Sequence, residues 1–237
     1  MKKVIIIGAS SGLGRELALH HIKNGNIVGI AARRENLLEE IRQINPSNVF
    51  IQKMDTTKAQ AKEQLLSLIE QMGGMDLFVY CSGKGYVNKE MDIDKEIQTV
   101  EVNVYGFTQL INIAYHYFEE KKKGHIVGIA SVAGIRTLSI CPSYCSSKRY
   151  NIMYLKALGQ LAKNKKLNIK VTTILPGFVD TEFVKTKYPL TISLEKGGNL
   201  LYKSIEKGNK RAFFPQYWSI IAFFMLIIPS FLWKKII

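Results

Sequence analysis

Cysteine, proline and long apolar runs are scarce in this sequence, and each scarcity excludes a class of protein. Three of the 237 residues are cysteine, and an odd number cannot form a complete disulfide framework. The apolar run at residues 4–7 is too short for the apolar region of a signal peptide. We therefore expect a cytoplasmic protein in a reducing compartment. Because no Pro/Gly/Ser-rich linker and no internal repeat divides the sequence, we expect a single domain.

Acidic residues are also few. The 19 Asp and Glu residues are outnumbered by 33 Lys and Arg residues, which gives a formal net charge of +14. A basic surface attracts nucleic acid, an anionic membrane or an anionic cofactor. The sequence has no nucleic-acid-binding motif, and lysine runs such as residues 121–123 are typical of a solvated face. A nucleic-acid partner is therefore not expected.

Metal ligands are not clustered in the sequence. Cys141 and Cys145 stand one helical turn apart, but no histidine or carboxylate cluster completes a metal site near them. We interpret them, with Cys81, as small residues of the core. The four histidines show no partner spacing and are interpreted as structural or exposed: His20, His21, His116 and His125.

Short β-branched runs alternate with longer helical segments. The predicted strands are 3–7, 26–31, 48–53, 75–81, 124–130, 168–175 and 211–214. The predicted helices are 12–24, 35–44, 57–72, 93–120, 143–164 and 194–207. Strands that are apolar on both faces are typical of a parallel sheet covered by helices. We predict an α/β fold, a Rossmann-like doubly wound parallel sheet of about seven strands over residues 1–214, followed by an apolar helical tail at 215–237.

A glycine-rich turn follows the first predicted strand. Its residues are Gly8, Ser10, Ser11, Gly12, Leu13, Gly14 and Arg15. Glycines at such a turn let the backbone approach a pyrophosphate, and the next helix offers its N–H groups and the positive end of its dipole. The spacing is Gly-x3-Gly-x-Gly rather than the Gly-x-Gly-x2-Gly fingerprint, and a plain tight turn is the alternative. The position at the first strand-helix junction favours a dinucleotide site.

Arginines replace a carboxylate at the end of the second predicted strand. Many NAD-binding domains place Asp or Glu there to hold the ribose hydroxyls. Here Arg33 and Arg34 would instead pair with a 2′-phosphate, and Arg15 would reach the same region. The pattern favours NADP(H) over NAD(H), against the alternative of three exposed arginines. Asp55 and Thr56, after the third strand, would meet the adenine amino group.

Four motifs in order resemble the short-chain dehydrogenase/reductase family over about residues 3–214. They are the glycine turn, Ser131, Tyr144-x3-Lys148 and Pro176-Gly177. The resemblance implies a catalytic set of Asn103, Ser131, Tyr144 and Lys148. It also implies a segment that lines the nicotinamide, with Pro176, Gly177, Val179 and Thr181. The family commonly forms dimers, so a homodimer or homotetramer is expected.

The sequence departs from the family pattern in two places. Ile7 stands where the family has a threonine before the first glycine. Tyr80-Cys81-Ser82-Gly83 replaces the family's Asn-Asn-Ala-Gly, which keeps Gly83 beside the cofactor and loses both asparagines. We expect an altered local geometry with all four reacting groups retained.

The spacing of Tyr144 and Lys148 suits an acid held beside a cation. Residues four apart lie on one face of a helix. A free tyrosine has a pKa of about 10, and we expect Lys148 and an oxidised nicotinamide to lower that pKa. Ser131 would donate a hydrogen bond to the substrate carbonyl oxygen. Asn103 would hold a water that links Lys148 to solvent.

An uncharged stretch runs from Ala212 to Trp233. Its apolar run is shorter than the roughly 20 residues of a spanning helix, contains Pro229, and spanning would carry Lys234-Lys235 across the membrane against the positive-inside tendency. An interfacial anchor at 215–235 on the anionic inner face of a membrane fits better. The remaining alternative is packing on a partner subunit or over the active site.

The segment that covers the substrate in the family is short here, at residues 182–190, which predicts an open cleft. With the apolar tail, it favours an apolar or lipid-like ketone or alcohol as substrate. A soluble reductase of a small polar carbonyl is one alternative. A non-catalytic NADP(H)-sensing protein is the other, although a sensor has no need of the Asn/Ser/Tyr/Lys set.

Overall fold

The computed structural model of the protein describes residues 1–181, 188–229 and 231–233. The strands are β1 (Lys3–Ile7), β2 (Ile27–Ala32), β3 (Val49–Lys53), β4 (Leu77–Tyr80), β5 (Lys123–Ile129), β6 (Asn168–Pro176) and β7 (Arg211–Phe214). The α-helices are α1 (Gly12–Lys23), α2 (Glu35–Arg42), α3 (Ala61–Gln71), α4 (Ile93–Val100), α5 (Phe107–Lys121), α6 (Pro142–Asn164), α7 (Leu194–Lys207) and α8 (Trp218–Ile227). A π-helical segment, η1 (Glu101–Gly106), joins α4 to α5, and a 3-10 turn, η2 (Val132–Gly134), follows β5.

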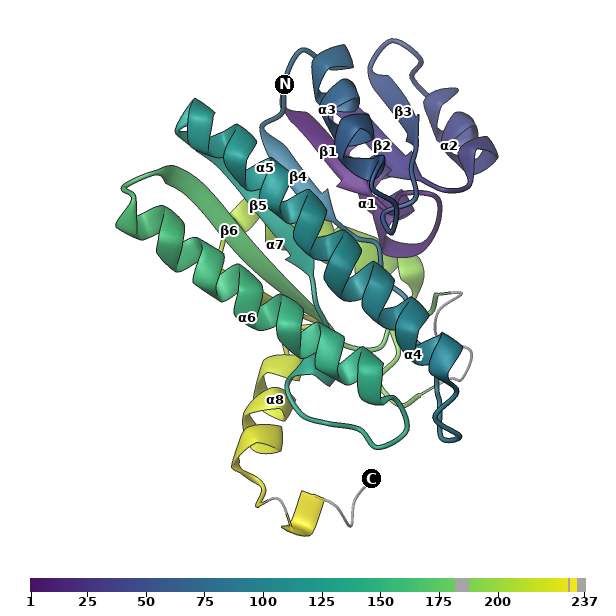
Figure 1. Ribbon diagram of the computed structural model, residues 1–237, viewed down its shortest axis with the longest axis vertical. Coiled ribbons are helices and arrows are strands. Elements are labelled where there is room, and N and C mark those ends of the chain that lie inside the picture. The colour runs from purple at the N-terminus through teal and green to yellow at the C-terminus, as the bar shows by residue number, and fades with distance from the viewer. Residues whose placement is uncertain (182–187, 230, 234–237) are drawn as a thin grey trace.

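The strands form one seven-stranded sheet in the order β3-β2-β1-β4-β5-β6-β7, and every pair of neighbours is parallel. The predicted doubly wound sheet is therefore confirmed (Figure 1). The strand order reverses between β1 and β4, which brings the loops after these two strands side by side at the carboxyl edge of the sheet. That edge is where open α/β sheets bind their ligands.

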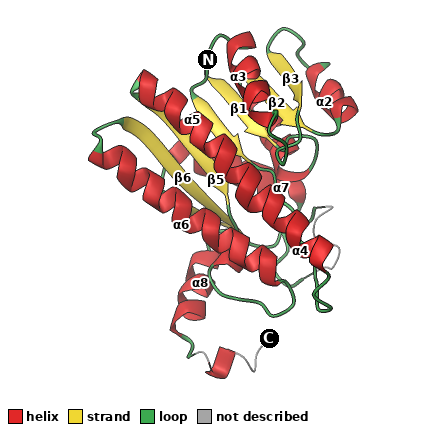
Figure 2. Cartoon of the chain, viewed as in Figure 1, coloured by secondary structure: helices red, strands yellow, loops and turns green. Residues whose placement is uncertain are grey.

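Helices cover both faces of the sheet, as the apolar strands predict (Figure 2). Ile5 and Ile7 of β1 belong to a core with α3, α5 and α6 on one face. Val4 and Ile6 point to the other face and join a core with α1, α2 and α7. All four side chains are fully buried. Successive strand residues are thus buried on opposite sides, which explains why the strands are apolar throughout.

The predicted helix at 93–120 is interrupted, which corrects that expectation. Helix α4 passes into the π-helical η1 before α5 begins. A Cβ on Gly106, at the end of η1, would lie 2.6 Å from the carbonyl oxygen of Thr56, so only glycine lets the helix approach the turn after β3 so closely. The hydroxyl of Tyr80 donates to the carbonyl oxygen of Val102 at 2.7 Å. These contacts with distant segments stabilise the π turn.

The tail, residues 215–237, leaves the sheet after the edge strand β7 and forms α8. Figure 1 shows α8 in yellow below the sheet, at the end of the molecule opposite the N-terminus. Within the described residues no helix combines the length and apolar character needed to cross a membrane. Trp218 and Ala222 of α8 are buried against the body of the protein. Lys234 and Lys235 lie outside the described residues.

Candidate active site

Glycines shape the turn after β1. Gly8 has a φ of +88°, and a Cβ there would lie 2.6 Å from the backbone nitrogen of Ser82. A Cβ on Gly14 would lie 2.2 Å from the carbonyl oxygen of Gly8. Gly12 begins α1, and Ser11 before it makes no side-chain cap hydrogen bond. The first turn of α1 therefore points its N–H groups at the carboxyl edge of the sheet without a side-chain cap, a geometry that suits a phosphate group.

The arginines after β2 lie beside this turn. Arg34 donates from Nη2 to the side-chain oxygens of Ser11 at 2.6 Å and Ser10 at 3.1 Å. Arg33 is exposed at the end of β2, and Arg15 is half-buried on α1. Arg34 therefore joins the end of β2 to the glycine turn. A cationic group stands where an NAD-type site would carry a carboxylate.

Asp55 and Thr56 lie in the turn after β3. Oδ1 of Asp55 accepts from the backbone nitrogen of Thr57 at 3.0 Å and from its Oγ1 at 2.8 Å. Burial raises the pKa of Asp55, but the hydrogen bonds from Thr57 and the nearby Arg33 outweigh it and hold the pKa below its usual value. Thr56 is buried, and its carbonyl oxygen accepts from Nε2 of Gln109 at 2.5 Å. The turn therefore presents an ionised carboxylate at the carboxyl edge.

A second group of predicted site residues lies together: Asn103, Gly83 and Lys148. Asn103 is 1% exposed; its amide accepts from the backbone nitrogen of Lys84 at 2.8 Å and donates to the same residue's carbonyl oxygen at 2.7 Å. Its Nδ2 also donates to Oγ of Ser147 at 2.9 Å. A Cβ on Gly83 would lie 3.3 Å from Nζ of Lys148 and 3.7 Å from Oδ1 of Asn103. The glycine thus leaves room for the amide and the ammonium to come together.

Tyr144 and Lys148 lie one turn apart on α6, with Ser131 opposite. The Tyr144 hydroxyl is hydrogen-bonded to the side chain of Ser131. Nζ of Lys148 donates to the carbonyl oxygen of Ile129 at 3.0 Å and lies 5.8 Å from the centroid of the Tyr144 ring. The structure therefore brings together all four residues of the predicted catalytic set.

The pKa values of this pair differ from the expectation. Burial raises the pKa of Tyr144 to about 12, although the hydrogen bond with Ser131 opposes it. Burial also lowers the pKa of Lys148 to about 8. With the protein's own groups alone, the cost of removing the phenolate from water outweighs the hydrogen bond with Ser131, and the nearby Cys145 and Cys141 raise the pKa further. The predicted lowering of the Tyr144 pKa is therefore wrong for the protein by itself.

The predicted nicotinamide segment follows β6. Pro176 ends the strand, and Val179 forms a parallel bridge with Ile192 and is 4% exposed. A Cβ on Gly12 would lie 3.8 Å from Cγ2 of Thr181, so the segment reaches across to the glycine turn. Both ends of a dinucleotide site thus border one edge of the sheet.

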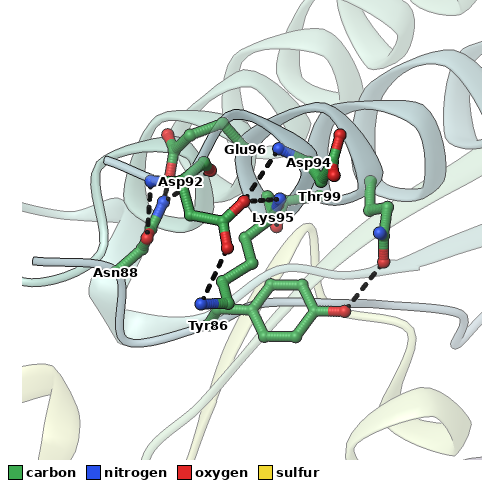
Figure 3. A network of polar contacts seen from close by, with 8 residues as sticks. Tyr86, Asn88, Asp92, Asp94, Lys95, Glu96 and Thr99 are labelled. Atoms are coloured by element: carbon green, nitrogen blue, oxygen red, sulfur yellow. Dashed lines mark hydrogen bonds and ion pairs between the residues drawn. The ribbon is translucent and has the colours of Figure 1, made fainter. Parts of the chain in front are cut away.

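A residue that the sequence did not indicate holds the start of α6. Oε2 of Glu96 accepts from the backbone nitrogen of Ser143 at 3.1 Å, and Oε1 accepts from Nδ2 of Asn88 at 2.7 Å. Figure 3 shows Glu96 and Asn88 in the polar network at the start of α4. A carboxylate near a helix N-terminus is favourable because of the helix dipole. Glu96 therefore fixes the turn that carries Tyr144.

Comparison with known proteins identifies the family. The model of the short chain dehydrogenase family matches residues 2–189. The chain belongs to this family. An uncharacterized oxidoreductase of Myxococcus xanthus is 30% identical over 238 residues, which cover 97% of this chain and 93% of that protein.

Solved structures of other short-chain dehydrogenases share the fold. One from Burkholderia cenocepacia, in complex with NADP, has a TM-score of 0.84 at 19% identity and covers 99% of this chain and 96% of its own. The bulky-bulky ketone specific alcohol dehydrogenase of Comamonas testosteroni has a TM-score of 0.78 at 17% identity, with 100% and 90% of the two chains covered. At these identities the likeness concerns the fold.

In this short-chain dehydrogenase, Tyr80 at the end of β4 and Cys81 after it stand where the family pattern has two asparagines. Tyr80 is 1% exposed, contacts η1 through its hydroxyl and packs edge-on against Phe107 with ring centroids 5.2 Å apart. Cys81 donates from its backbone nitrogen to the carbonyl oxygen of Ile7 at 2.8 Å. Burial raises the pKa of its thiol to about 12, so the thiol stays neutral. Through its hydroxyl, Tyr80 thus holds the backbone of η1 beside Asn103.

A cavity of about 600 Å³ lies at the opposite, amino edge of the sheet. Its lining includes Lys2, Lys121, Lys123 and Lys170. Helix α5 ends at Lys121, so lysines in this region lie near the negative end of a helix dipole. The cavity is therefore separate from Tyr144. We interpret its lysines as charges that are favourable at the end of α5, not as groups that take part in the reaction.

The predicted substrate cover at 182–190 falls largely outside the described residues, since 182–187 are not described. Its last part approaches the candidate site. The Tyr188 ring stacks on that of Phe178 with centroids 4.6 Å apart. The Tyr217 hydroxyl donates to the carbonyl oxygen of Leu190 at 3.1 Å. The tail thus contacts the end of this segment.

Proposed function

We propose that this protein is an NADP(H)-dependent oxidoreductase that interconverts a ketone and a secondary alcohol, with Tyr144 as the general acid/base. One observation carries the proposal. Tyr144 is hydrogen-bonded to Ser131, and Nζ of the buried Lys148 lies 5.8 Å from the centroid of the Tyr144 ring. Gly83 beside them leaves room for Asn103. A binding module would have no need to bury an ammonium next to a phenol, because burying a charge is costly.

The residues at the carboxyl edge fit the cofactor. The uncapped first turn of α1 and the space kept by Gly8 and Gly14 suit the pyrophosphate, and Arg34, with Arg33, would hold a 2′-phosphate. The segment with Gly177 and Thr181 would line the nicotinamide, and Asp55 would meet the adenine. When bound, NADPH supplies the hydride.

The chain's own residues supply and hold the proton. Oγ of Ser131 accepts from the backbone nitrogen of Ala133 at 3.1 Å, so its hydroxyl hydrogen is left to bond Tyr144 or the substrate carbonyl oxygen. Tyr144 gives its proton to that oxygen. Lys148, with a pKa of about 8, stays cationic at neutral pH and favours the phenolate that forms. Asn103 would hold a water that connects Lys148 to solvent.

Turnover of NADPH with a panel of ketones tests the proposal. We expect Tyr144→Phe to lose at least about a hundredfold in kcat, the contribution of a general acid, with NADPH affinity unchanged. Tyr150→Phe is the matched control, because Tyr150 lies on the same helix and bonds Oγ1 of Thr108 at 2.8 Å, outside the site. Equal turnover in the two variants would overturn the acid role. NADPH binding without turnover across the panel would favour the sensing alternative.

Cofactor preference is a separate test. Arg34→Ala removes the guanidinium that lies on the glycine turn, and we expect the preference for NADPH over NADH to fall about tenfold or more, since hydrogen bonds to charged groups are worth roughly 1.5–3 kcal/mol. Arg42→Ala, on the outer helix α2, is the control. An unchanged preference in Arg34→Ala would refute the assignment of the 2′-phosphate.

We further propose an apolar or lipid-like substrate and a cytoplasmic protein held on the inner face of the membrane by its tail. Many side chains of α8 are exposed and apolar, which supports both. The Comamonas enzyme, specific for bulky ketones, has the same fold. If kcat/KM were highest for short polar carbonyls, the alternative of a soluble reductase of a small polar carbonyl would replace this part.

We also propose that the protein forms a homodimer or homotetramer. Ile93, Ile97 and Val100 repeat along one side of α4 and are 67%, 49% and 41% exposed. Met153 on the neighbouring α6 is 50% exposed. Exposed apolar rows of this kind are typical of subunit contacts. Light scattering of Ile97→Lys tests the contact, and an unchanged mass would contradict it.

A further inference from the structure

One arginine joins the tail to the loop that precedes the catalytic helix. This loop, residues 131–141, runs from the end of β5 to α6 and is called the Ser131 loop below. Nη1 of Arg136, in the middle of the loop, donates to the carbonyl oxygens of Met225 and Ile228. Both oxygens belong to the end of α8. The loop is therefore bonded directly to the end of the tail helix.

A second contact reinforces the first. The Arg136 guanidinium lies 4.8 Å from the centroid of the Trp233 ring, and Nε1 of Trp233 donates to the carbonyl oxygen of Thr137 at 2.9 Å. The last turn of α8 contains no basic residue of its own. Arg136 thus supplies from outside the cation and the donors that a helix C-terminus needs.

The other end of α8 is fixed to the same part of the site. Trp218 is 6% exposed and packs against Gly177, so closely that a Cβ there would lie 1.8 Å from the indole Nε1. Trp218 and Ala222 share an apolar cluster with Val132 and Ile135 of the Ser131 loop. The helix therefore lies between the Ser131 loop and the proposed nicotinamide segment and contacts both.

The rest of α8 and the chain beyond it expose apolar side chains. Those more than half exposed are Ile220, Phe223, Phe224, Leu226, Ile227 and Phe231. Phe223 and Phe224 are consecutive, so they lie about 100° apart around the helix rather than on one stripe. After Glu206 the chain has no acidic side chain and five cations, Lys207, Lys210, Arg211, Lys234 and Lys235. An apolar surface on a stretch of sequence whose only charges are positive complements an anionic lipid surface better than the single stripe of a second copy.

We infer that docking of the tail on anionic lipid orders the Ser131 loop through Arg136, and that lipid thereby raises turnover. The inference rests on the proposed function for its effect on turnover. Docking removes water from the bonds between Arg136 and α8, and such bonds strengthen where the dielectric constant is low. Coupling between two binding sites is reciprocal. If lipid on the tail stabilises the ordered Ser131 loop, the ordered loop therefore makes the tail bind lipid more tightly. Arg136 is a positioning residue in this scheme.

Tryptophan fluorescence tests the docking. The chain has two tryptophans, Trp218 and Trp233, and both lie in the tail, so the emission reports on this segment alone. We expect a blue shift and quenching by brominated lipid with vesicles of phosphatidylcholine and phosphatidylglycerol, and a weaker effect with phosphatidylcholine alone. Trp218→Phe should keep most of the quenching, because Trp233 is the less buried of the two. Unchanged emission with both vesicles, or a change that follows protein concentration without lipid, would overturn lipid as the occupant.

Hydrogen exchange tests the coupling without any need of a substrate. We expect anionic vesicles to slow exchange of the Ser131 loop amides about fivefold or more, the lower range of allosteric coupling. In the Arg136→Gln variant this slowing should disappear, although the tail of the variant should still bind lipid. Arg42→Gln, which changes the charge equally at the far edge of the sheet, should behave as the wild type. Equal slowing in Arg136→Gln would overturn the inference.

A second variant and a second readout keep the test decisive. Should Arg136→Gln fail to fold, Arg136→Lys keeps the charge but lacks the planar fork, and we expect it to lose most of the slowing. In turnover assays, vesicles should raise kcat about fivefold in the wild type and not in the Arg136 variants, with KM for NADPH unchanged. Turnover that ignores vesicles would overturn this inference alone. Loop slowing without turnover of any ketone would overturn the proposed function alone.

Discussion

The contact between Gly177 and Trp218 predicts a large stability cost for a single methyl group. A Cβ on Gly177 would lie 1.8 Å from Nε1 and 2.2 Å from Cε2 of the Trp218 ring. The ring cannot move aside freely, because it is buried and packs edge-on against Phe178 with centroids 5.4 Å apart. Overpacking of this kind costs about 1–3 kcal/mol, and we expect Gly177→Ala to fall at the upper end.

Removal of the indole should cancel that cost. Trp218→Ala alone should lower the free energy of unfolding by about 3–5 kcal/mol, the usual result of emptying a buried aromatic site. In this background the new methyl group meets no ring, so Gly177→Ala should cost less than about 0.5 kcal/mol. The double-mutant cycle therefore predicts a coupling of about 2.5 kcal/mol between Gly177 and Trp218, which are distant in sequence.

Urea unfolding of the four proteins, followed by circular dichroism, measures this coupling. Gly159→Ala is the matched control, because a Cβ there would lie 3.6 Å from Cβ of Val171, an ordinary contact. In the middle of α6 that change should stabilise the protein by roughly 0.5–1 kcal/mol. If the costs of Gly177→Ala and Trp218→Ala simply add, the tail does not pack on the nicotinamide segment and the reasoning is refuted.

Four further predictions follow from buried groups. Burial lowers the pKa of His21 from 6.5 to about 4, so stability should fall by about 3 kcal/mol as pH drops through that range, and urea unfolding of His21→Gln should show a shallower fall. Ketone reduction should slow as pH rises through about 8, where Lys148 loses its proton, and the pH-rate profile of Lys148→Arg should lack this limb. Alcohol oxidation should instead speed up with pH across the measurable range, as more Tyr144 becomes phenolate. Cys141 and Cys145 are buried with their sulfurs 3.4 Å apart, so a thiol reagent should label them slowly in the native protein and at once in denaturant.

Much of the fold could be predicted from the sequence because buried parallel strands need apolar residues at every position. The predicted strand limits differ from the observed ones by at most two residues at each end. The break at η1 could not be predicted, because it depends on the bonds of Asn103 to Lys84 and Ser147 and of Tyr80 to Val102. A helical pattern carries no record of such tertiary contacts.

The same distinction applies to the candidate site. Tyr144 and Lys148 were found because they belong to four motifs that occur in order along the sequence, and helical spacing explains why the two side chains lie together. Glu96 and Arg136 were missed because each acts on a segment distant in sequence: Glu96 on Ser143, 47 residues away, and Arg136 on the tail, 89 and 92 residues away. Nothing in the local sequence of a single Glu or Arg distinguishes it from a solvated surface residue. The tail was likewise open to three interpretations, and the packing of its first half became clear only from the indole of Trp218.

The pKa values of Tyr144 and Lys148 also show why the effect of burial must be weighed against the effect of nearby charge. The sequence supplies the cation four residues after the phenol, and on that basis the phenol should become more acidic. The structure buries Lys148 and half-buries Tyr144, and with a pKa of about 12 on the order of one Tyr144 in 10⁵ is ionised at pH 7. A phenol that keeps its proton is a donor, which suits reduction of a ketone, whereas oxidation of an alcohol needs the phenolate first. Burial outweighs the hydrogen bond with Ser131, and a positive charge that enters the site on binding would stabilise the phenolate. The protein by itself is therefore prepared to give a proton rather than to take one.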